Sequence, residues 1–494
     1  MKYLSIPAIA LLLAACSPKA PSTYGSIDAT PKIFPDYTDI TVPTNIAPLN
    51  FLIEEKADRY VTVIKAGTKE VSFKGREIRI PISRWHQLTA EPEITVQVYA
   101  LNDGKWNAYS PFQITVSEEI DPYISYRVIM PSVECYERLS INQRDITSFN
   151  QKVIYSNEMV QSGDNGQCIN CHHFRNYTTS NMQFHARQYQ GGTIMVIDDQ
   201  LRKLNLKTDS TISGGVYPAW HPTHDYIAYS TNKTHQSIHS IDHNRIEVAD
   251  EESDLILYDI RNNAVSVIEN DPNEFECFPA WSPDGKELYY VSAHYEAPFD
   301  ENRRNKVFLD SRKIRYDLYR KPFDPDTRTW GKSERILEAS SDSNSITLPR
   351  ISPDGRYLMF SMAPYGVFHI WHRESDLWLM DLENDTVRIL EELNSPEVES
   401  YHSWSSNGKW VVFSTRREDG AYTRLYLSHL NDNGSFSKPF ALPQRDPSFN
   451  RKYMYSFNIP EFTIEPVHTT PRQFASLISG SEATRSKYES KKGE

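Results

Sequence analysis

The sequence contains few cysteines, which cross-link very small proteins, and few glycines, which collagen requires at every third position. It contains 5 cysteines and 19 glycines in 494 residues, which excludes a disulfide-dense miniprotein and a collagen. At roughly 100 to 200 residues per domain, this length predicts two to four domains. Positive charge is also scarce, because 53 Lys and Arg face 65 Asp and Glu and the net charge is −12. Such a chain repels phosphate backbones, so we expect no nucleic-acid partner.

Hydrophobic runs are short, and the clearest one lies at the N-terminus. Lys2 precedes an apolar run from Ile6 to Ala15, which is too short to span a bilayer and predicts a signal peptide over residues 1–15. The run ends in LAAC at Cys16, which resembles a bacterial lipobox and implies a lipid on that cysteine. An ordinary signal peptide cleaved elsewhere is the alternative. Residues 16–35 are rich in Pro, Ser and Thr, which predicts a tether.

The predicted lipid also predicts a location. Each buried CH₂ of an acyl chain contributes roughly 0.8 kcal/mol, so two or more chains anchor a protein stably without crossing the membrane. Ser17 stands where an Asp would, by resemblance to Gram-negative lipoproteins, imply retention in the inner membrane. We therefore expect a cell-envelope lipoprotein of the outer membrane that faces the periplasm, with exposure at the cell surface as the alternative.

A cofactor motif lies near the middle of the chain. Residues 168–172 read CINCH, which matches the C-x-x-C-H signature of c-type haem attachment. Cys168 and Cys171 can each form a thioether with one haem vinyl group, and His172 then becomes the proximal iron ligand. The motif predicts one covalent haem c. A redox disulfide or a zinc site is the alternative, although no thioredoxin-like unit and no second ligand pair is visible.

The second axial ligand would decide the chemistry of such a haem. His or Met in that position gives electron transfer, whereas an open position gives ligand binding or peroxidase chemistry. The segment that follows the motif offers Met182 and His185 within reach of a short loop, and we favour His185. Arg187 is a candidate partner for a haem propionate, because guanidinium matches carboxylate in a bidentate pair.

Two further groups of residues leave their roles open. Cys135 and Cys277 could form a disulfide in an oxidising compartment, but the sequence cannot show whether their Cα atoms approach within about 7 Å. His235, His239 and His243 are spaced by four residues. The segment has no amphipathic pattern, so solvated loop histidines are favoured over a metal site.

A repeat organises the C-terminal half. Four segments share an aromatic or aliphatic residue, a turn of Pro-Asp-Gly type and an alternating apolar strand. The anchor residues are Trp220, Trp281, Ile351 and Trp404. Each segment is followed by a further strand, so the unit is a repeated four-stranded sheet. This pattern predicts a β-propeller, in which the tryptophans and turns are structural residues.

The repeats resemble the W-S-P-D-G segments of TolB-like propellers over about residues 190–465. The resemblance implies a propeller domain over residues 193–465 with five or six blades. We expect a fifth blade to form from residues 193–206 together with strand-like residues near 453–465. The first and last copies depart from the motif, so the blades are not equivalent.

The remaining segments complete the predicted fold. Residues 36–118 contain short alternating runs between turn signals, which predict an immunoglobulin-like β-sandwich. Residues 119–192 predict a short irregular haem-binding segment, and residues 473–494 a disordered tail. The predicted fold class is therefore all-β, with a sandwich, the haem-binding segment and a C-terminal propeller.

These features predict a membrane-anchored mono-haem protein that acts in electron transfer or redox sensing. Its expected partner is a periplasmic redox or envelope protein that docks on the propeller. The alternative is a propeller scaffold that binds proteins or glycans, with the haem structural or absent. A haem enzyme with an open iron position is a third hypothesis, but non-enzymatic function is favoured, and no G-x-S-x-G elbow of a hydrolase is present.

We predict that Cys16→Ala releases the protein from the membrane fraction, because the variant cannot carry the acyl chains of a lipoprotein. Fractionation of cells followed by immunoblotting measures the distribution. A Cys16→Ala variant that stays in the membrane fraction as firmly as the native protein would contradict the lipobox.

Overall fold

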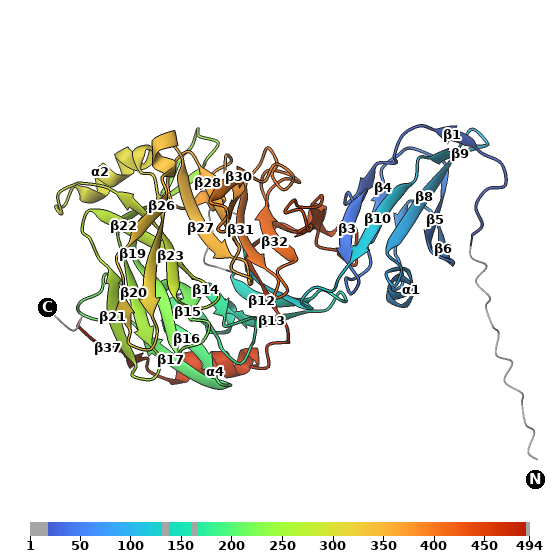
Figure 1. The fold of residues 1–494 in the computed structure, drawn as a ribbon. Coiled ribbons are helices and arrows are strands. Elements are labelled where there is room, and N and C mark those ends of the chain that lie inside the picture. Colours follow the sequence, from blue (N-terminus) through green and yellow to red (C-terminus); the bar gives the residue numbers. More distant parts are fainter. Residues whose placement is uncertain (1–17, 131–137, 161–165, 491–494) are drawn as a thin grey trace, which may run out of the picture.

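The computed structural model describes residues 18–130, 138–160 and 166–490. The fold is all-β, with several sheets and few short helices. Figure 1 shows the N-terminal strands, in blue, beside a larger body that holds the rest of the chain. The predicted signal peptide, Cys16 and Cys135 lie outside the described residues.

The N-terminal region consists of two sheets and a helix, α1 (Ile82–Leu88). The larger sheet contains β1 (Gly25–Ile27), β3 (Ile40–Pro43), β5 (Arg59–Ala66), β6 (Lys69–Lys74), β8 (Glu93–Asn102), β9 (Lys105–Tyr109) and β10 (Phe112–Ser117). The smaller sheet contains β2 (Ile33–Phe34), β4 (Phe51–Ile53) and β7 (Glu77–Ile78). Strands β1 and β2 come from the predicted tether, so that prediction is wrong for these residues. They are held by pairing with β9 and β4.

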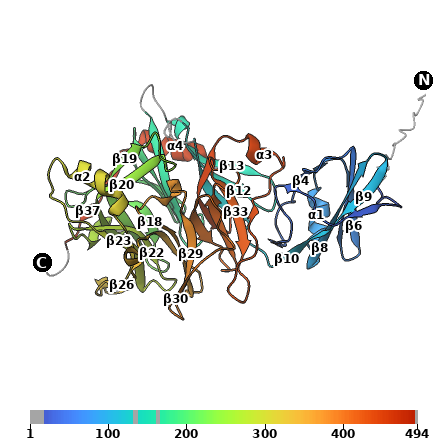
Figure 2. The same cartoon turned by 90° about the horizontal axis from the view of Figure 1, so that it is seen from above.

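The larger body is propeller-like. Within the described residues its strands form six groups, which we call blades 1 to 6, and a bridge between β20 and β22 joins blades 3 and 4 in one sheet. The innermost strands of neighbouring blades contact one another around a ring. Figure 2 shows this body from above, with the N-terminal strands at one side. Blade 1 contains β35 (Ser456–Thr463), β11 (Tyr123–Ile129), β12 (Ser140–Asp145) and β13 (Gln151–Ser156). Blade 2 contains β14 (Gln167–Phe174), β15 (Met182–Gln188), β16 (Gly192–Ile197) and β17 (Gln200–Asn205). Blade 3 contains β18 (Val216–Trp220), β19 (Tyr226–Ile238), β20 (Ile246–Asp259) and β21 (Ala264–Glu269).

Blades 4 to 6 follow in chain order. Blade 4 contains β22 (Glu274–Trp281), β23 (Glu287–His294), β24 (Asp317–Asp324), β25 (Thr329–Trp330) and β26 (Glu334–Leu337). Blade 5 contains β27 (Ser345–Ile351), β28 (Tyr357–Ala363), β29 (Asp376–Asp381) and β30 (Thr386–Ile389), and blade 6 contains β31 (Glu399–Trp404), β32 (Trp410–Thr415), β33 (Arg424–His429) and β34 (Phe440–Ala441). The four sequence repeats begin at the innermost strands of blades 3 to 6.

The ring is closed by the two ends of the larger body. Strand β35 pairs antiparallel with β11, and not with residues 193–206 as the sequence predicts. Those residues instead form β16 and β17, the outer strands of blade 2. The segment 119–192 is therefore not irregular, because five of the strands named above lie within it. It lacks the W-S-P-D-G turn, so the sequence repeat does not extend to it.

The innermost strands share a local distortion. Each pairs with its neighbour through a β-bulge, and in five of the six strands a residue before or at the bulge has positive φ: 55° at Cys171, 48° at Tyr217, 52° at Phe278, 56° at Leu348 and 54° at Ile459. In four of these strands the next residue is proline, which has no N–H to leave unpaired. In β14 it is His172. The C-x-x-C-H motif therefore lies on the common bulge.

The C-terminal tail is ordered through residue 490. Helix α4 (Pro471–Gly480) begins at a capping box formed by Thr470 and Gln473, with proline in the first turn. Strands β36 (Thr484–Arg485) and β37 (Lys487–Tyr488) then add to blades 2 and 3. The predicted disorder is wrong for residues 473–490, because they contain most of α4 and the strands β36 and β37, and the apolar residues Phe474 and Ile478 are fully buried.

The other helices are short. They are α2 (Arg303–Asp310), α3 (Phe449–Lys452), η1 (Asn157–Met159), η2 (Ser311–Lys313), η3 (Ala339–Asp342) and η4 (His369–Trp371). In the part of the chain that the structure describes, no helix is long and apolar enough to cross a membrane.

One apolar cluster joins the N-terminal sheets to the ring. It contains Phe112 of β10, Tyr126 of β11 and Trp410 of β32. Polar contacts cross the same boundary, such as the 2.8 Å contact between Lys438 Nζ and Asp36 Oδ2. The N-terminal region and blades 1 and 6 therefore share a core.

We predict that Trp410→Ala destabilises the protein by about 3–5 kcal/mol, because it removes a fully buried aromatic side chain from this shared core. Denaturant unfolding, followed by the far-UV circular dichroism of the backbone, measures the change in the free energy of unfolding. Ile241→Ala serves as the control, since Ile241 is 96% exposed. Equal stability of the Trp410→Ala variant and the native protein would rule out a shared core.

Candidate functional site

The C-x-x-C-H motif lies in β14, and its neighbour β15 carries the other candidate residues. Cys168 is paired with Arg187, and Asn170 with His185. Directly opposed residues of an antiparallel pair project from the same face of the sheet. The structure therefore brings the predicted Cys168, His185 and Arg187 together on one face.

This face borders a cavity with a volume of about 640 Å³. Cys168, Asn170, His185 and Arg187 line it, together with Arg127 of β11 and Lys207, which follows β17. None of the described residues that line the cavity is Asp or Glu. Among the described residues, the charged side chains that line this cavity are Arg127, Arg187 and Lys207, in a chain with a net charge of −12. Such a lining favours an anionic ligand.

His185 is oriented by one hydrogen bond. The residue is buried, with 5% of its surface exposed. Its Nδ1 atom lies 2.9 Å from the hydroxyl oxygen of Thr193 on β16. Its Nε2 atom has no hydrogen-bond partner among the described residues. Burial, together with the nearby Arg187, lowers the pKa of His185 to about 3, so the imidazole is neutral. Neutral imidazole with an available ring nitrogen is the form that binds metals.

His172 and Cys171 lie behind this wall and do not line the cavity. Both are at least 97% buried, since Cys171 is 3% exposed and His172 1%. Burial, with a contribution from Arg127, lowers the pKa of His172 to about 3 against the opposing effect of the backbone at Ser125 and Ile459. Neither ring nitrogen makes a hydrogen bond of normal geometry within the described residues. Burial also raises the pKa of the Cys171 thiol.

Met182 and His185, the two candidate axial ligands, project from opposite faces of β15, because side chains alternate along a strand. Met182 lies three residues before His185, so its side chain projects from the opposite face. There it is fully buried in an apolar cluster with Ile169, Phe174 and Phe184. The cavity is lined by His185 and not by Met182.

Unsatisfied buried polar atoms gather around β14 and β15. Besides His172 and His185, the side-chain oxygen of Asn170 and Nε2 of Gln183 have no hydrogen-bond partner in the described part of the chain. Most buried polar groups in native proteins are paired, so each exception needs an explanation, and one explanation is a bound group.

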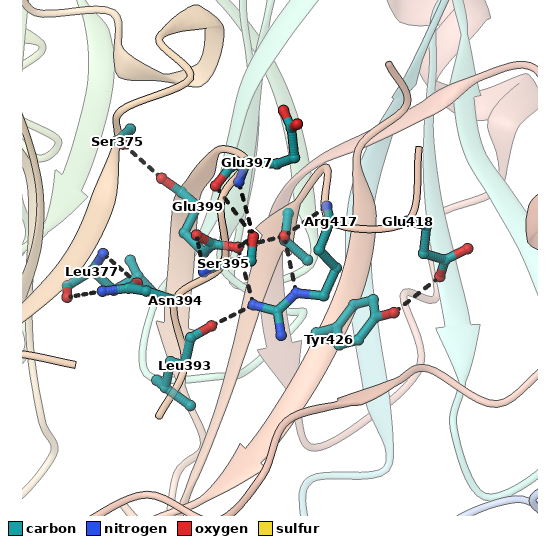
Figure 3. A network of polar contacts seen from close by, with 11 residues as sticks. Ser375, Leu377, Leu393, Asn394, Ser395, Glu397, Glu399, Arg417, Glu418 and Tyr426 are labelled. Carbon is teal, nitrogen blue, oxygen red and sulfur yellow. Dashed lines mark hydrogen bonds and ion pairs between the residues drawn. The ribbon is translucent and has the colours of Figure 1, made fainter. Parts of the chain in front are cut away.

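One buried charge elsewhere in the ring is well satisfied. Glu399 of β31 is fully buried, and its carboxylate accepts hydrogen bonds from Ser395 Oγ at 2.7 Å, Thr415 Oγ1 at 2.6 Å and Arg417 Nη2 at 3.0 Å (Figure 3). Figure 3 shows these groups converging from neighbouring segments. This network has the character of a structural site, in contrast to the surroundings of β14.

A second cavity, of about 400 Å³, borders the far end of β14. His173, Arg350 and Glu461 line it, and His173 Nε2 lies 3.9 Å from a carboxylate oxygen of Glu461. Burial raises the pKa of Glu461 to about 8, against the effect of Arg350. Strand β14 therefore runs between two cavities, with Cys168 at one and His173 at the other.

The other predicted cysteine and histidine sites are placed as follows. Cys277 is buried on β22 and does not form a disulfide with Cys168 or Cys171, while its proposed partner Cys135 is outside the described residues. His235 contacts Arg304, and His243 contacts Glu374. No group of three or more His, Cys, Asp or Glu side chains among the described residues could hold a metal ion.

Sequence reasoning missed Arg127, Thr193 and Lys207. Arg127 comes from a strand that the sequence did not reveal, and Lys207 follows the fourth strand of blade 2. Only Thr193 could have been found, since a hairpin between residues 182–188 and 192–197 places it opposite His185.

Comparison with known proteins assigns no family. No family model and no curated protein matches the chain. Solved structures that resemble it include a puromycin-hydrolysing peptidase of Mycobacterium tuberculosis, with 10% identity, a TM-score of 0.35 and coverage of 72% of this chain. The chain spans about half of that peptidase, with 52% covered. A mutant of Synechocystis apocarotenoid oxygenase has 10% identity, a TM-score of 0.38 and coverage of 88% of this chain and 100% of its own.

A third resemblance is to the GH74 enzyme of Niastella koreensis, with 10% identity, a TM-score of 0.38 and coverage of 63% of this chain and 45% of that enzyme. TM-scores below 0.5 at such identities transfer no activity, substrate or cofactor to this chain.

We predict that His172 makes the stability of the protein sensitive to acid. Its folded pKa of about 3 lies below the ordinary 6.5, so the unfolded state binds the proton first as the pH falls. The stabilisation is complete above pH 6.5 and declines toward pH 3. Between pH 7 and pH 5, protonation of this one group in the unfolded state lowers the free energy of unfolding by on the order of 2 kcal/mol.

The experiment uses a Cys168→Ala/Cys171→Ala background, in which no thioether can form. Denaturant unfolding at pH 7 and pH 5 should show that adding His172→Gln reduces the acid-induced loss by on the order of 2 kcal/mol. His86→Gln, on the exposed side of α1, should leave the loss unchanged. An unchanged loss in the His172→Gln variant would show that this imidazole is not kept neutral by burial.

Proposed function

We propose that this protein carries one haem c, attached through Cys168 and Cys171, in the cavity beside β14, and that it transfers electrons or senses redox state in the cell envelope. The proposal is carried by one observation. The strand that contains C-x-x-C-H borders a cavity whose charged lining residues, in the described part of the chain, are all cations, and His185 in its wall has one ring nitrogen without a hydrogen-bond partner.

The residues present suit such a group in several respects. Cys168 lines the cavity and is a partly exposed residue. Arg127 and Arg187 line the same cavity, and guanidinium groups are suited to binding propionate carboxylates. The volume of about 640 Å³ lies in the range of cavities that hold cofactor-sized ligands.

Cys171 and His172 set a condition on this proposal. Because both are buried behind the cavity wall, the second thioether requires the bulge at Cys171 to turn toward the cavity. The positive φ of 55° at Cys171 belongs to the bulge that the innermost strands share, so this turn would change a feature common to the ring.

Attachment itself is balanced without an oxidant. Each thiol adds across a vinyl double bond, so that sulfur bonds one carbon and the proton goes to the other. When bound, the haem supplies a one-electron couple between ferric and ferrous iron. The chain supplies the tethering thiols, the cations that offset the propionate charge, and the burial that tunes the potential.

The proposed location follows from Cys16. A lipid at this cysteine would hold the protein on the outer membrane, and the propeller-like ring would offer a docking surface to a redox or envelope protein in the periplasm. An oxidising compartment of this kind is also where covalent haem attachment takes place on exported chains.

A second candidate function is binding of an anionic ligand without haem, by a scaffold that recruits an envelope protein or glycan. The burial of His172 favours it, since the imidazole is not presented to the cavity. The cationic side chains that line the cavity would bind such an anionic ligand as well as they would bind haem propionates.

Denaturing electrophoresis with peroxidase staining separates the two candidates. We predict a stained band at the mass of the intact chain when the protein is exported in a host that attaches haem c. The Cys168→Ala/Cys171→Ala variant should lose the band, because no thioether remains.

Cys277→Ala is the matched control. Cys277 is also a buried cysteine on an innermost strand, but it does not line the cavity, so this variant should keep the band. A colourless native protein would refute the haem proposal and leave the scaffold. Loss of the band in the Cys277→Ala variant would assign the staining to something other than the motif.

A further inference from the structure

The second cavity, of about 400 Å³, is lined by one equivalent residue from the innermost strand of every blade. In the five strands whose bulge has a residue of positive φ, the lining residue stands two positions after it. On β31 it stands immediately before the anchor Trp404. We call these six residues the collar: His173, Ala219, Ala280, Arg350, Ser403 and Glu461.

The collar has an apolar part and a polar part. Blades 3 and 4 contribute Ala219 and Ala280, and the anchor residues Trp220 and Trp281 line the cavity beside them. The other four blades contribute ionisable or hydroxyl side chains. Mostly apolar walls with a few polar groups are the usual lining of a site for a small organic molecule.

Hydrogen bonds between blades hold the collar in shape. Trp281 Nε1 on blade 4 donates to the carbonyl oxygen of Ala219 on blade 3 at 3.0 Å. Trp404 Nε1 on blade 6 donates in the same way to the carbonyl oxygen of Arg350 on blade 5 at 3.2 Å. A ligand would therefore enter a site whose walls are already ordered, which lowers the entropic cost of binding.

Arg350 is a cation of the collar with few partners of its own. Among the described residues, its guanidinium makes one hydrogen bond, from Nη1 to the carbonyl oxygen of Pro349 at 3.3 Å, and no ion pair with a carboxylate. Burial lowers the pKa of Arg350. A desolvated cation without a close counterion costs free energy, and a carboxylate is the partner that fits guanidinium best.

Glu461 lies on the same collar but does not serve as this counterion. Its Oε2 accepts a hydrogen bond from the backbone N–H of Phe174 at 3.2 Å. Burial raises the pKa of Glu461 to about 8, although Arg350 acts in the opposite direction. At pH 7 most of this carboxyl group is protonated, so it can donate its O–H to a second carboxylate instead of repelling it.

We propose that this cavity binds a small monocarboxylate with an apolar body. Its carboxylate would pair with Arg350, and its apolar body would lie against Ala219, Ala280 and the neighbouring tryptophans. This site is separate from the cavity beside β14, so the inference goes beyond the proposed function and does not depend on a haem.

The first test is isothermal titration calorimetry of the intact protein at pH 7 with phenylacetate and with phenylacetamide, its neutral isostere. Phenylacetate should bind, and phenylacetamide should bind at least about tenfold more weakly, because an amide cannot form the charge-assisted pair with Arg350. Equal affinity for the two compounds, or no binding of phenylacetate, would overturn the proposal.

The second test locates the ligand with variants. Arg350→Gln should weaken phenylacetate binding by at least about tenfold. Arg356→Gln is the matched control, because Arg356 belongs to the same blade, pairs with Asp381 at 3.1 Å and does not line the cavity. It should keep the native affinity. Native affinity in a folded Arg350→Gln variant would overturn the proposal.

Two further variants cover a failure of Arg350→Gln to fold and binding at the other cavity. Ala280→Leu narrows the apolar side without changing any charge, so it should weaken binding, and native affinity in this variant would overturn the proposal. Lys207→Gln removes a cation from the cavity beside β14 and should leave phenylacetate binding unchanged. Loss of binding in Lys207→Gln would assign the ligand to that cavity and overturn the proposal.

Discussion

The pairing of β35 with β11 is the interaction on which the candidate site depends. It joins segments that are more than 300 residues apart, and it places Arg127 of β11 beside β14. The entropic cost of closing such a long loop grows only slowly with length, by about 0.6 kcal/mol for each doubling. The ladder of hydrogen bonds between the two strands and the buried residues of the shared core offset it. Without this closure, β14 would lose one neighbour and the cavity one wall.

The repeat made blades 3 to 6 predictable, because each contains an anchor residue, a turn and an alternating strand within a short segment. Blades 1 and 2 were not predictable in this way. Blade 1 is assembled from both ends of the ring, and pairing between distant segments leaves no local pattern. Blade 2 has the bulge of the other innermost strands, but Cys171 and His172 replace the usual residue and proline, so the repeat is hidden by the motif itself. The immunoglobulin-like detail of the N-terminal sheets stays a prediction, as does the haem.

The residues of the candidate site that lie close together in the sequence could be predicted, and those from distant segments could not. The motif indicated Cys168, and the short distance along the chain to His185 and Arg187 indicated that they could return to it. Strand alternation could also have separated Met182 from His185, since an odd spacing puts them on opposite faces. Met182 and His185 were expected on a short loop, where strand alternation does not apply. Arg127 and Lys207 reach the cavity only through the tertiary fold, and nothing near them in the sequence points to it.

The candidate site differs from the rest of the ring in how well its buried polar groups are satisfied by hydrogen bonds. The Glu399 network shows that this fold can bury a charge and satisfy it with several hydrogen bonds. Around β14, by contrast, imidazole nitrogens of His172 and His185 lack hydrogen-bond partners among the described residues. Such unpaired buried atoms cost free energy in the folded chain alone. A ligand that binds only the folded state returns that free energy by mass action, and a ligand with a hydrogen-bonding or coordinating group for imidazole would remove this cost. The unpaired imidazole nitrogens therefore define the chemistry of the ligand more narrowly than the volume of the cavity does.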